Sequence, residues 1–96
     1  MNRRPVFKFR LFVADHATNS LQAVANLKTL CAQYLPERHE IEIVDVHRTP
    51  ERALSEGVLM TPTLIKTSPS PVRKIVGTLS QTRTVLQALG LESQVA

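Results

Sequence analysis

The chain has 96 residues, a length that supports one hydrophobic core and predicts a single domain over residues 1–96. Its hydrophobic fraction of 43% is ordinary for a globular protein, and no apolar run approaches the roughly 20 residues that cross a bilayer, so we expect no membrane segment. The net charge of +4 comes with three phenylalanines and one tyrosine, and this scarcity of stacking side chains argues against nucleic-acid binding. One cysteine cannot form an intramolecular disulfide, which predicts a reducing, cytoplasmic location.

The first half of the chain predicts a strand, a helix and a second strand. Residues 6–13 alternate apolar and charged side chains, which is typical of a strand, and Phe12 on the charged face predicts that this face is partly covered. After a cap at residues 18–20, apolar residues recur at spacings of three and four as far as Pro36, which predicts an amphipathic helix. Residues 41–46 predict the second strand, and such a crossover is right-handed in nearly all proteins.

The second half predicts shorter elements. A cap at Thr49 predicts a helix that ends near Gly57. Residues 63–66 and 72–76 predict two brief strands that pair antiparallel across a proline turn. Ser80 is the predicted cap of a last helix. The order β–α–β–α–β–β–α predicts an α/β fold with helices on both faces of a mixed sheet.

The step Thr61-Pro62-Thr63 before a strand resembles the loop that thioredoxin-like folds build around a cis proline. An X–Pro bond adopts the cis form at a cost of only about 0.5–1 kcal/mol. A thioredoxin-type enzyme also needs a Cys-x-x-Cys pair after its first strand, with one thiolate to attack and one to resolve. At that place this chain reads Val13-Ala14-Asp15-His16-Ala17, without sulfur. A thioredoxin-like fold that lacks the reactive cysteine pair predicts a binding protein and not an enzyme.

Several segments along the chain, taken together in their order and spacing, match the motifs of one known family. They are Leu11-Phe12-Val13-Ala14, Leu27-Lys28-Thr29-Leu30, Val44-Asp45-Val46, Thr61-Pro62-Thr63-Leu64, and Pro71-Val72-Arg73-Lys74-Ile75-Val76-Gly77 with Leu79-Ser80. Together they resemble the KaiB family, small proteins of the cyanobacterial circadian clock with relatives in other bacteria. The resemblance covers nearly the whole chain. It implies a regulator without catalysis or cofactor that binds the first ATPase ring of the hexameric ATPase and kinase KaiC, in circadian timing or a related stress or growth response.

The resemblance also implies a metamorphic fold. The first half is common to a ground state ordered β–α–β–β–α–α–β, usually a homotetramer, and to a KaiC-binding monomer with the thioredoxin-like order. Pro62, Pro69 and Pro71 punctuate the half that rearranges, and proline isomerisation, which takes tens of seconds or more, is the expected slow step. Family members often carry glycine where this chain has Ala88. Because alanine favours a helix by about 1 kcal/mol over glycine, we expect Ala88 to favour the thioredoxin-like state.

Lys66, Arg73 and Lys74 flank the proline turn and match basic positions of the family's KaiC-facing surface. The resemblance therefore assigns them to partner binding, and a solvated hairpin is the alternative.

In clocks that contain KaiA, the KaiC-bound form of KaiB also captures that activator. The chain stops at residues 91–96 without the long acidic tail of some cyanobacterial members, and relatives occur without KaiA, so docking on a KaiC-type ring is expected while a KaiA-like partner stays open. The resting state, whether tetramer or dimer, and the isomer of Pro62 stay open as well.

Two other functions remain as alternatives. One is a thioredoxin-like oxidoreductase or a redox-inactive chaperone of that fold, which the missing cysteine pair disfavours. The other is a sensor or adaptor domain that resembles the KaiC-binding input domain of a histidine kinase. It would be a stable monomer with an associated kinase.

The remaining reactive side chains predict no site. Cys31 falls on the apolar face of the first helix and is expected to pack in the core. His16, His39 and His47 are spaced too widely for a local zinc site. Asp45 and His47 could share a strand face as an acid–base pair, but no nucleophile accompanies them. We therefore assign no catalytic, cofactor or metal residue.

Overall fold

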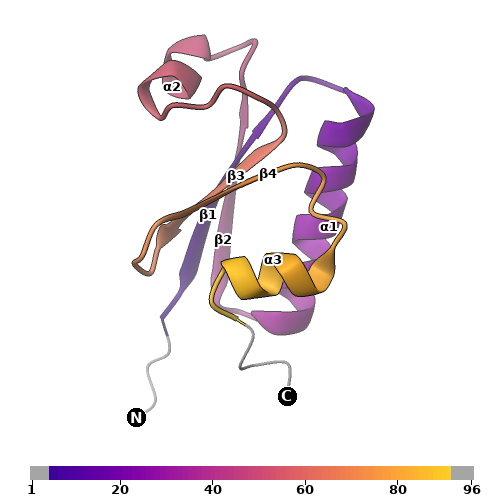
Figure 1. The fold of residues 1–96 in the computed structure, drawn as a ribbon, viewed down its shortest axis with the longest axis vertical. Coiled ribbons are helices and arrows are strands. Elements are labelled where there is room, and N and C mark those ends of the chain that lie inside the picture. Colours follow the sequence, from indigo (N-terminus) through magenta and orange to yellow (C-terminus); the bar gives the residue numbers. More distant parts are fainter. Residues whose placement is uncertain (1–4, 92–96) are drawn as a thin grey trace.

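The computed structural model describes residues 5–91 as a four-stranded sheet with three helices (Figure 1). The elements are β1 (Phe7–Val13), α1 (Thr18–Tyr34), β2 (His39–Asp45), α2 (Pro50–Ser55), β3 (Thr63–Ser68), β4 (Arg73–Val76) and α3 (Thr82–Ala88). The predicted order of elements is confirmed. The expectation about an acidic tail concerns residues 92–96, which lie outside the described part. None of the helices within residues 5–91 is long and apolar enough to span a membrane.

The strands lie in the order β2–β1–β3–β4. β1 and β2 run parallel, from Phe7 opposite His39 to Val13 opposite Asp45. β3 runs antiparallel to both β1 and β4. A parallel pair needs a crossover connection, and α1 supplies it. Of the two arrangements expected for the second half, this one is thioredoxin-like.

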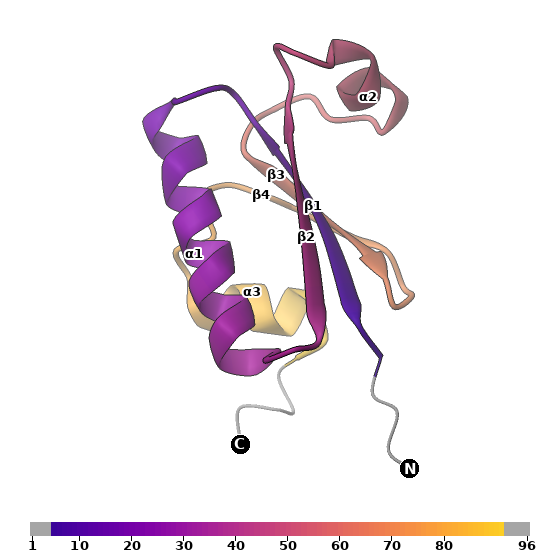
Figure 2. The ribbon, with the colours of Figure 1, turned by 180° about the vertical axis from the view of Figure 1, so that it is seen from behind.

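Two apolar cores lie on opposite faces of β1, as its alternation predicts. Phe9 and Leu11 are buried in the larger core with residues of α1 and α3. Phe12 belongs to the smaller core, with Ala53 of α2 and Ile65 of β3. Figures 1 and 2 show α1 and α3 together on one side of the sheet, and α2 apart from them at the end where β2 finishes. The expectation that the charged face is also covered is confirmed.

Two predicted helix caps serve other hydrogen bonds. Ser20 lies inside α1, where its hydroxyl accepts the N–H of Ala14 at 3.0 Å. α3 begins after Gln81, and the Ser80 hydroxyl oxygen accepts a hydrogen bond from the Thr78 hydroxyl at 3.1 Å. Short polar side chains can form hydrogen bonds with several nearby backbone and side-chain groups, so the partner that they bind depends on the conformation of the surrounding turn. The helices themselves are confirmed, but these caps are predicted wrongly. α1 follows Ala17, so all three candidates at residues 18–20 lie inside it, and α3 follows Gln81 instead of Ser80.

Four charged side chains tie α2 to the sheet. Arg10 of β1 donates from Nε to Glu42 of β2 at 3.0 Å and from Nη1 to Glu56, at the end of α2, at 2.6 Å. Arg52 of α2 donates from Nη1 and Nη2 to the Glu42 carboxylate at 2.6 and 3.0 Å. These hydrogen bonds, from Arg52 and then from Arg10, lower the pKa of Glu42 to about 2. Glu42 therefore joins β1, β2 and α2 through one carboxylate.

Lys66 of β3 is buried, with 3% of its surface exposed. Its Nζ lies 3.5 Å from the carbonyl oxygen of Leu89, just after α3, and 5.5 Å from the centre of the Phe7 ring. Burial lowers the pKa of Lys66, and the nearby positive charge of Arg73 lowers it further. A buried ammonium with one long hydrogen bond costs stability compared with an apolar side chain.

Glu42→Gln is expected to lower the free energy of unfolding at pH 7. The variant removes the charge that Arg10 and Arg52 share, and exposed ion pairs contribute roughly 0.2–1 kcal/mol each. Glu42 is 49% exposed, so solvent screening keeps the loss small. Because its pKa is lowered on folding, the carboxylate stabilises the fold above about pH 4.5, and this contribution is lost as the pH falls towards 2. Urea unfolding across this pH range measures the difference.

Glu40→Gln is the matched control, because Glu40 is exposed on the same strand. Its substitution should leave the free energy of unfolding nearly unchanged. A stability gap between Glu42→Gln and the natural protein that persisted at pH 2 would contradict the ion-pair interpretation.

Lys66→Met is expected to raise the free energy of unfolding at pH 7, because methionine keeps the length of the side chain and removes the buried charge. The ordinary pKa of a lysine is 10.5, and the pKa of Lys66 in the folded state is lower. At pH values between the folded-state pKa and 10.5, the unfolded state therefore binds more protons than the folded state. Stability of the natural protein therefore rises with pH in that interval, and the advantage of the variant shrinks. Unfolding at pH 7 and pH 10 tests both statements. A variant less stable at pH 7 would mean that the contacts to Leu89 and Phe7 outweigh the cost of burial.

Candidate functional site

The turn between β1 and α1 takes the position of a thioredoxin-type cysteine pair. The side chains of Asp15 and His16 are 65% and 87% exposed there, and Asp15 has a left-handed backbone with φ of 50°. Cys31 lies in the core of α1 with none of its surface exposed, and burial raises the pKa of its thiol to about 12. Such a thiol stays protonated at neutral pH and is not a nucleophile. The expected core role of Cys31 is confirmed.

A pocket of about 220 Å³ joins this turn to the loop before β3. Its walls include Ala14 of the turn, His47 of the β2–α2 loop, and Val58, Leu59, Met60 and Thr61 of the loop before β3. The Thr61–Pro62 peptide bond beside it is cis, in agreement with the resemblance to a cis-proline loop. The lining holds neither a thiol nor a carboxylate. The pocket can receive an apolar side chain, but it offers no group that would react with one.

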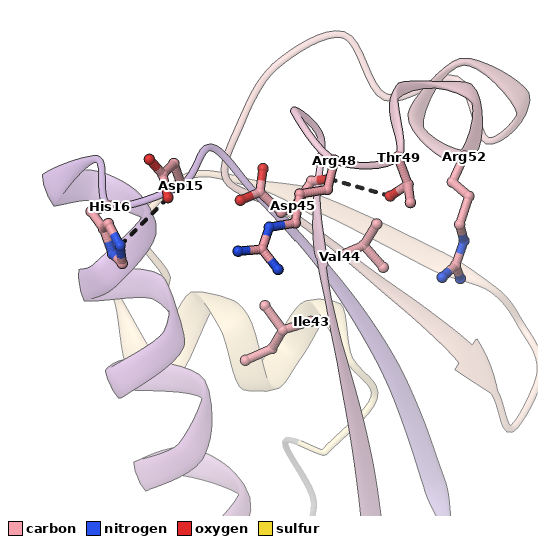
Figure 3. A pocket seen from close by; sticks show the side chains of 8 residues that line it. All are labelled: Asp15, His16, Ile43, Val44, Asp45, Arg48, Thr49 and Arg52. Atoms are coloured by element: carbon pink, nitrogen blue, oxygen red, sulfur yellow. Dashed lines mark hydrogen bonds and ion pairs between the residues drawn. The ribbon is translucent and has the colours of Figure 1, made fainter.

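A second pocket, of about 380 Å³, lies at the ends of β1 and β2 (Figure 3). Charged side chains of both signs line it, namely Asp15, Asp45, Arg48 and Arg52. The Asp45 carboxylate accepts a hydrogen bond from the backbone N–H of His47 at 2.8 Å. The backbone carbonyl of Asp45 accepts one from the Thr49 hydroxyl at 3.2 Å. Since β2 ends at Asp45, Asp45 and His47 do not share a strand face, which agrees with the absence of a catalytic assignment to them. The carboxylate holds a turn instead.

No three His, Cys, Asp or Glu side chains within residues 5–91 come together in a way that could hold a metal ion. His16 and His47 are exposed, and Nδ1 of His39 lies 2.7 Å from the Leu35 carbonyl oxygen at the end of α1.

The three predicted partner-binding residues lie in different environments. Arg73 and Lys74 are exposed on β4. The ammonium of Lys74 lies 3.0 Å from the Glu56 carbonyl oxygen and 3.4 Å from that of Gly57, where it satisfies the end of α2. Lys66 lies in the core, so the solvated-hairpin alternative is wrong for it. A partner could contact Lys66 only after the side chain left the core.

The four predicted fold-switch residues all lie in the second half. Pro62, Pro69 and Pro71 each follow a cis peptide bond, the first before β3 and the other two in the β3–β4 turn. Ala88 is the last residue of α3, so the helix predicted at this position is confirmed. The switching role of the four residues stays a prediction.

Three exposed apolar side chains in and after α2 were not predicted from the sequence. Leu54 of α2 is 77% exposed, and Leu59 and Met60 in the following loop are 92% and 62% exposed. Leu59 and Met60 also share the lining of the 220 Å³ pocket. The available signal was the apolar run at residues 58–60, which is too short for an element of its own.

Comparison with known proteins shows the family directly. The KaiB domain family matches residues 10–91. The circadian clock protein KaiB3 of Synechocystis sp. is 41% identical over 83 residues, which cover 86% of this chain and 79% of that protein. The circadian clock oscillator protein KaiB of Gloeothece citriformis is 39% identical over 88 residues, which cover 92% and 83% of the two chains.

Solved structures show the fold. The N-terminal domain of Synechococcus elongatus SasA superposes with a TM-score of 0.75 at 19% identity, covering 98% of this chain and 90% of that domain. Chloroplastic thioredoxin z gives a TM-score of 0.73 at 17% identity, covering 94% and 81%. At these identities the likeness concerns architecture alone, and it agrees with the sheet order described above. By its sequence relatives and its thioredoxin-like fold, the chain belongs to the KaiB family of circadian clock proteins.

Proposed function

We infer that this chain is a non-enzymatic regulatory protein that binds a KaiC-type hexameric ATPase, in circadian timing or in a related stress or growth response. The observation that carries the proposal is the β2–β1–β3–β4 sheet in a member of the KaiB family, because the family resemblance ties ring binding to this arrangement. The site supports it too. Exposed apolar and basic side chains lie near the ends of β1 and β2, and the pocket beside the cis proline has neither a thiol nor a carboxylate in its lining.

Charge suits a protein partner with an acidic surface. The chain carries 12 lysines and arginines against 8 acidic residues. Arg73 and Lys74 are exposed on the edge strand β4. Charges at the rim of an interface steer encounter and make binding weaken with salt. In this proposal the protein acts in the cytoplasm, without a cofactor, and with neither nucleic acid nor membrane as its partner.

A second candidate function has one observation in its favour. The fold matches the SasA N-terminal domain over 98% of this chain. A free-standing sensor or adaptor domain of the histidine-kinase input type would have this fold and would stay monomeric. The resting oligomeric state separates the candidates, because a tetramer or dimer favours the KaiB ground state.

The chain is expected to co-elute with a KaiC-type hexamer in size-exclusion chromatography with ATP. A hexamer peak free of this chain at concentrations well above micromolar would contradict the proposed function.

Arg73→Glu should weaken association with the hexamer and reduce the salt dependence of that association, since it reverses an exposed charge. Lys28→Glu, an equally exposed change on α1, is the control and should leave both unchanged.

Ala88→Gly is expected to shift the population away from the thioredoxin-like arrangement. Glycine weakens a helix interior by about 1 kcal/mol, and because Ala88 is the last residue of α3, the expected change in the two-state ratio is at most about fivefold. Ala25→Gly in α1 is the control, because α1 belongs to the half that both arrangements share. Amide resonances of β4 and α3 report the ratio. Identical spectra for the natural protein and Ala88→Gly would contradict a role for this residue.

A further inference from the structure

The two parallel strands end side by side, at Val13 of β1 and Asp45 of β2. The helix that follows β1, α1, packs in the larger core, whereas the helix that follows β2, α2, packs in the smaller core on the opposite face. Two connections that leave for opposite faces open a crevice beyond the carboxyl ends of their strands. In open α/β sheets such crevices are the usual place of ligand binding.

The pocket of about 380 Å³ lies at this point of the fold (Figure 3). We call it the strand-end pocket, and its lining includes Asp15, Ile43, Asp45 and Arg48. Small-molecule sites have volumes of about 300–1,000 Å³, so the strand-end pocket has room for a small ligand.

One of the two arginines in the lining is available to a ligand. Arg52 already donates two hydrogen bonds to Glu42, at 2.6 and 3.0 Å. Arg48 is exposed and forms no ion pair within residues 5–91. Figure 3 shows its side chain extended over Ile43 towards the β1–α1 turn, with Arg52 on the other side of the pocket. Because a guanidinium can donate two parallel hydrogen bonds to a carboxylate, Arg48 offers a place for one.

Two carboxylates of the protein line the same pocket. Asp15 is 65% exposed, and its Oδ1 lies 3.5 Å from Nε2 of His16. Asp45 uses its Oδ1 for the backbone N–H of His47. Each carboxylate therefore has a second oxygen that can accept a hydrogen bond, and an ammonium group carries three donors.

The lining also limits the kind of ligand. A phosphate would meet the negative charges of Asp15 and Asp45 beside a single free guanidinium, which disfavours a dianion. No three His, Cys, Asp or Glu side chains in the described residues could hold a metal ion. Ile43 is 44% exposed and offers an apolar contact between the charged groups. A ligand that carries one ammonium, one carboxylate and an apolar group satisfies all three features.

We propose that the strand-end pocket binds a free α-amino acid with an apolar side chain. The carboxylate of the amino acid binds Arg48, its ammonium binds Asp15 and Asp45, and its side chain packs on Ile43. This site goes beyond the proposed function and needs no KaiC-type ring.

The test compares L-leucine with two analogues that each lack one charge. 3-Methylbutylamine lacks the carboxylate, and 4-methylpentanoate lacks the ammonium. L-Leucine should cause saturable shifts of the amide resonances of Asp15, Asp45 and Arg48 in NMR titrations of the natural protein. Each analogue should bind at least about fivefold more weakly, because a hydrogen bond between charged groups is lost.

Two variants test the protein side of the same contacts. Arg48→Gln and Asp15→Asn should each weaken L-leucine binding at least about fivefold. Asparagine tolerates the φ of 50° at residue 15, and Arg48 is exposed, so both variants should keep the circular dichroism and melting of the natural protein. The matched controls are Arg83→Gln and Glu40→Gln, which change exposed charges outside the lining and should leave the affinity unchanged.

Three results would overturn the proposal. The first is the absence of saturable shifts with L-leucine at concentrations well above millimolar. The second is an analogue that binds as tightly as L-leucine, since the pocket would then not recognise both charges. The third is an affinity that Arg48→Gln lowers no more than Arg83→Gln does. All titrations use the chain without a ring, so none of these results bears on ring binding.

Discussion

A central strand that is buried on both faces needs a covering helix on each side of the sheet, and β1 imposes this requirement here. Leu11 and Phe12 are neighbours in sequence, and neither has exposed surface. Because successive side chains of a strand point to opposite faces, one must be covered by α1 and α3 and the other by α2. The positions of all three helices follow from this strand.

The two coverings differ in how they are held. α1 contributes five buried residues, whereas α2 contributes Ala53 alone. α2 depends instead on the carboxylate of Glu42 and on Lys74 at its C-terminal end. Short helices draw their stability from tertiary contacts, and for α2 these are the burial of Ala53 together with the polar contacts of Glu42 and Lys74. On the other face, the buried ammonium of Lys66 donates to the Leu89 carbonyl just after α3. Apolar burial therefore contributes more to holding α1 on the sheet than to holding α2.

The geometry explains how a thioredoxin-like scaffold can serve recognition. The cis proline and the β1–α1 turn meet at one pocket, as the fold dictates, but the turn carries Asp15 and His16 where a redox enzyme carries thiols. The nearby α2 is too short to cover the loop that follows it, so Leu59 and Met60 stay in solvent. The surface beside the cis proline is therefore apolar and carries no thiol in the lining of its pocket.

The sequence alone determined the elements whose signals are local. The alternation in β1, the periodicity of α1 and the proline turn between β3 and β4 each appear within a few residues, so the order of elements and both faces of β1 could be predicted. Tertiary structure decided the features that depend on distant neighbours. The hydroxyl of Ser20 binds Ala14 instead of capping, Lys66 turns inward below α3, and Leu59 is left exposed because α2 ends early. The physical reason is that the burial of a side chain depends on which distant elements of the chain pack against it, and the residues next to it in sequence do not determine that packing.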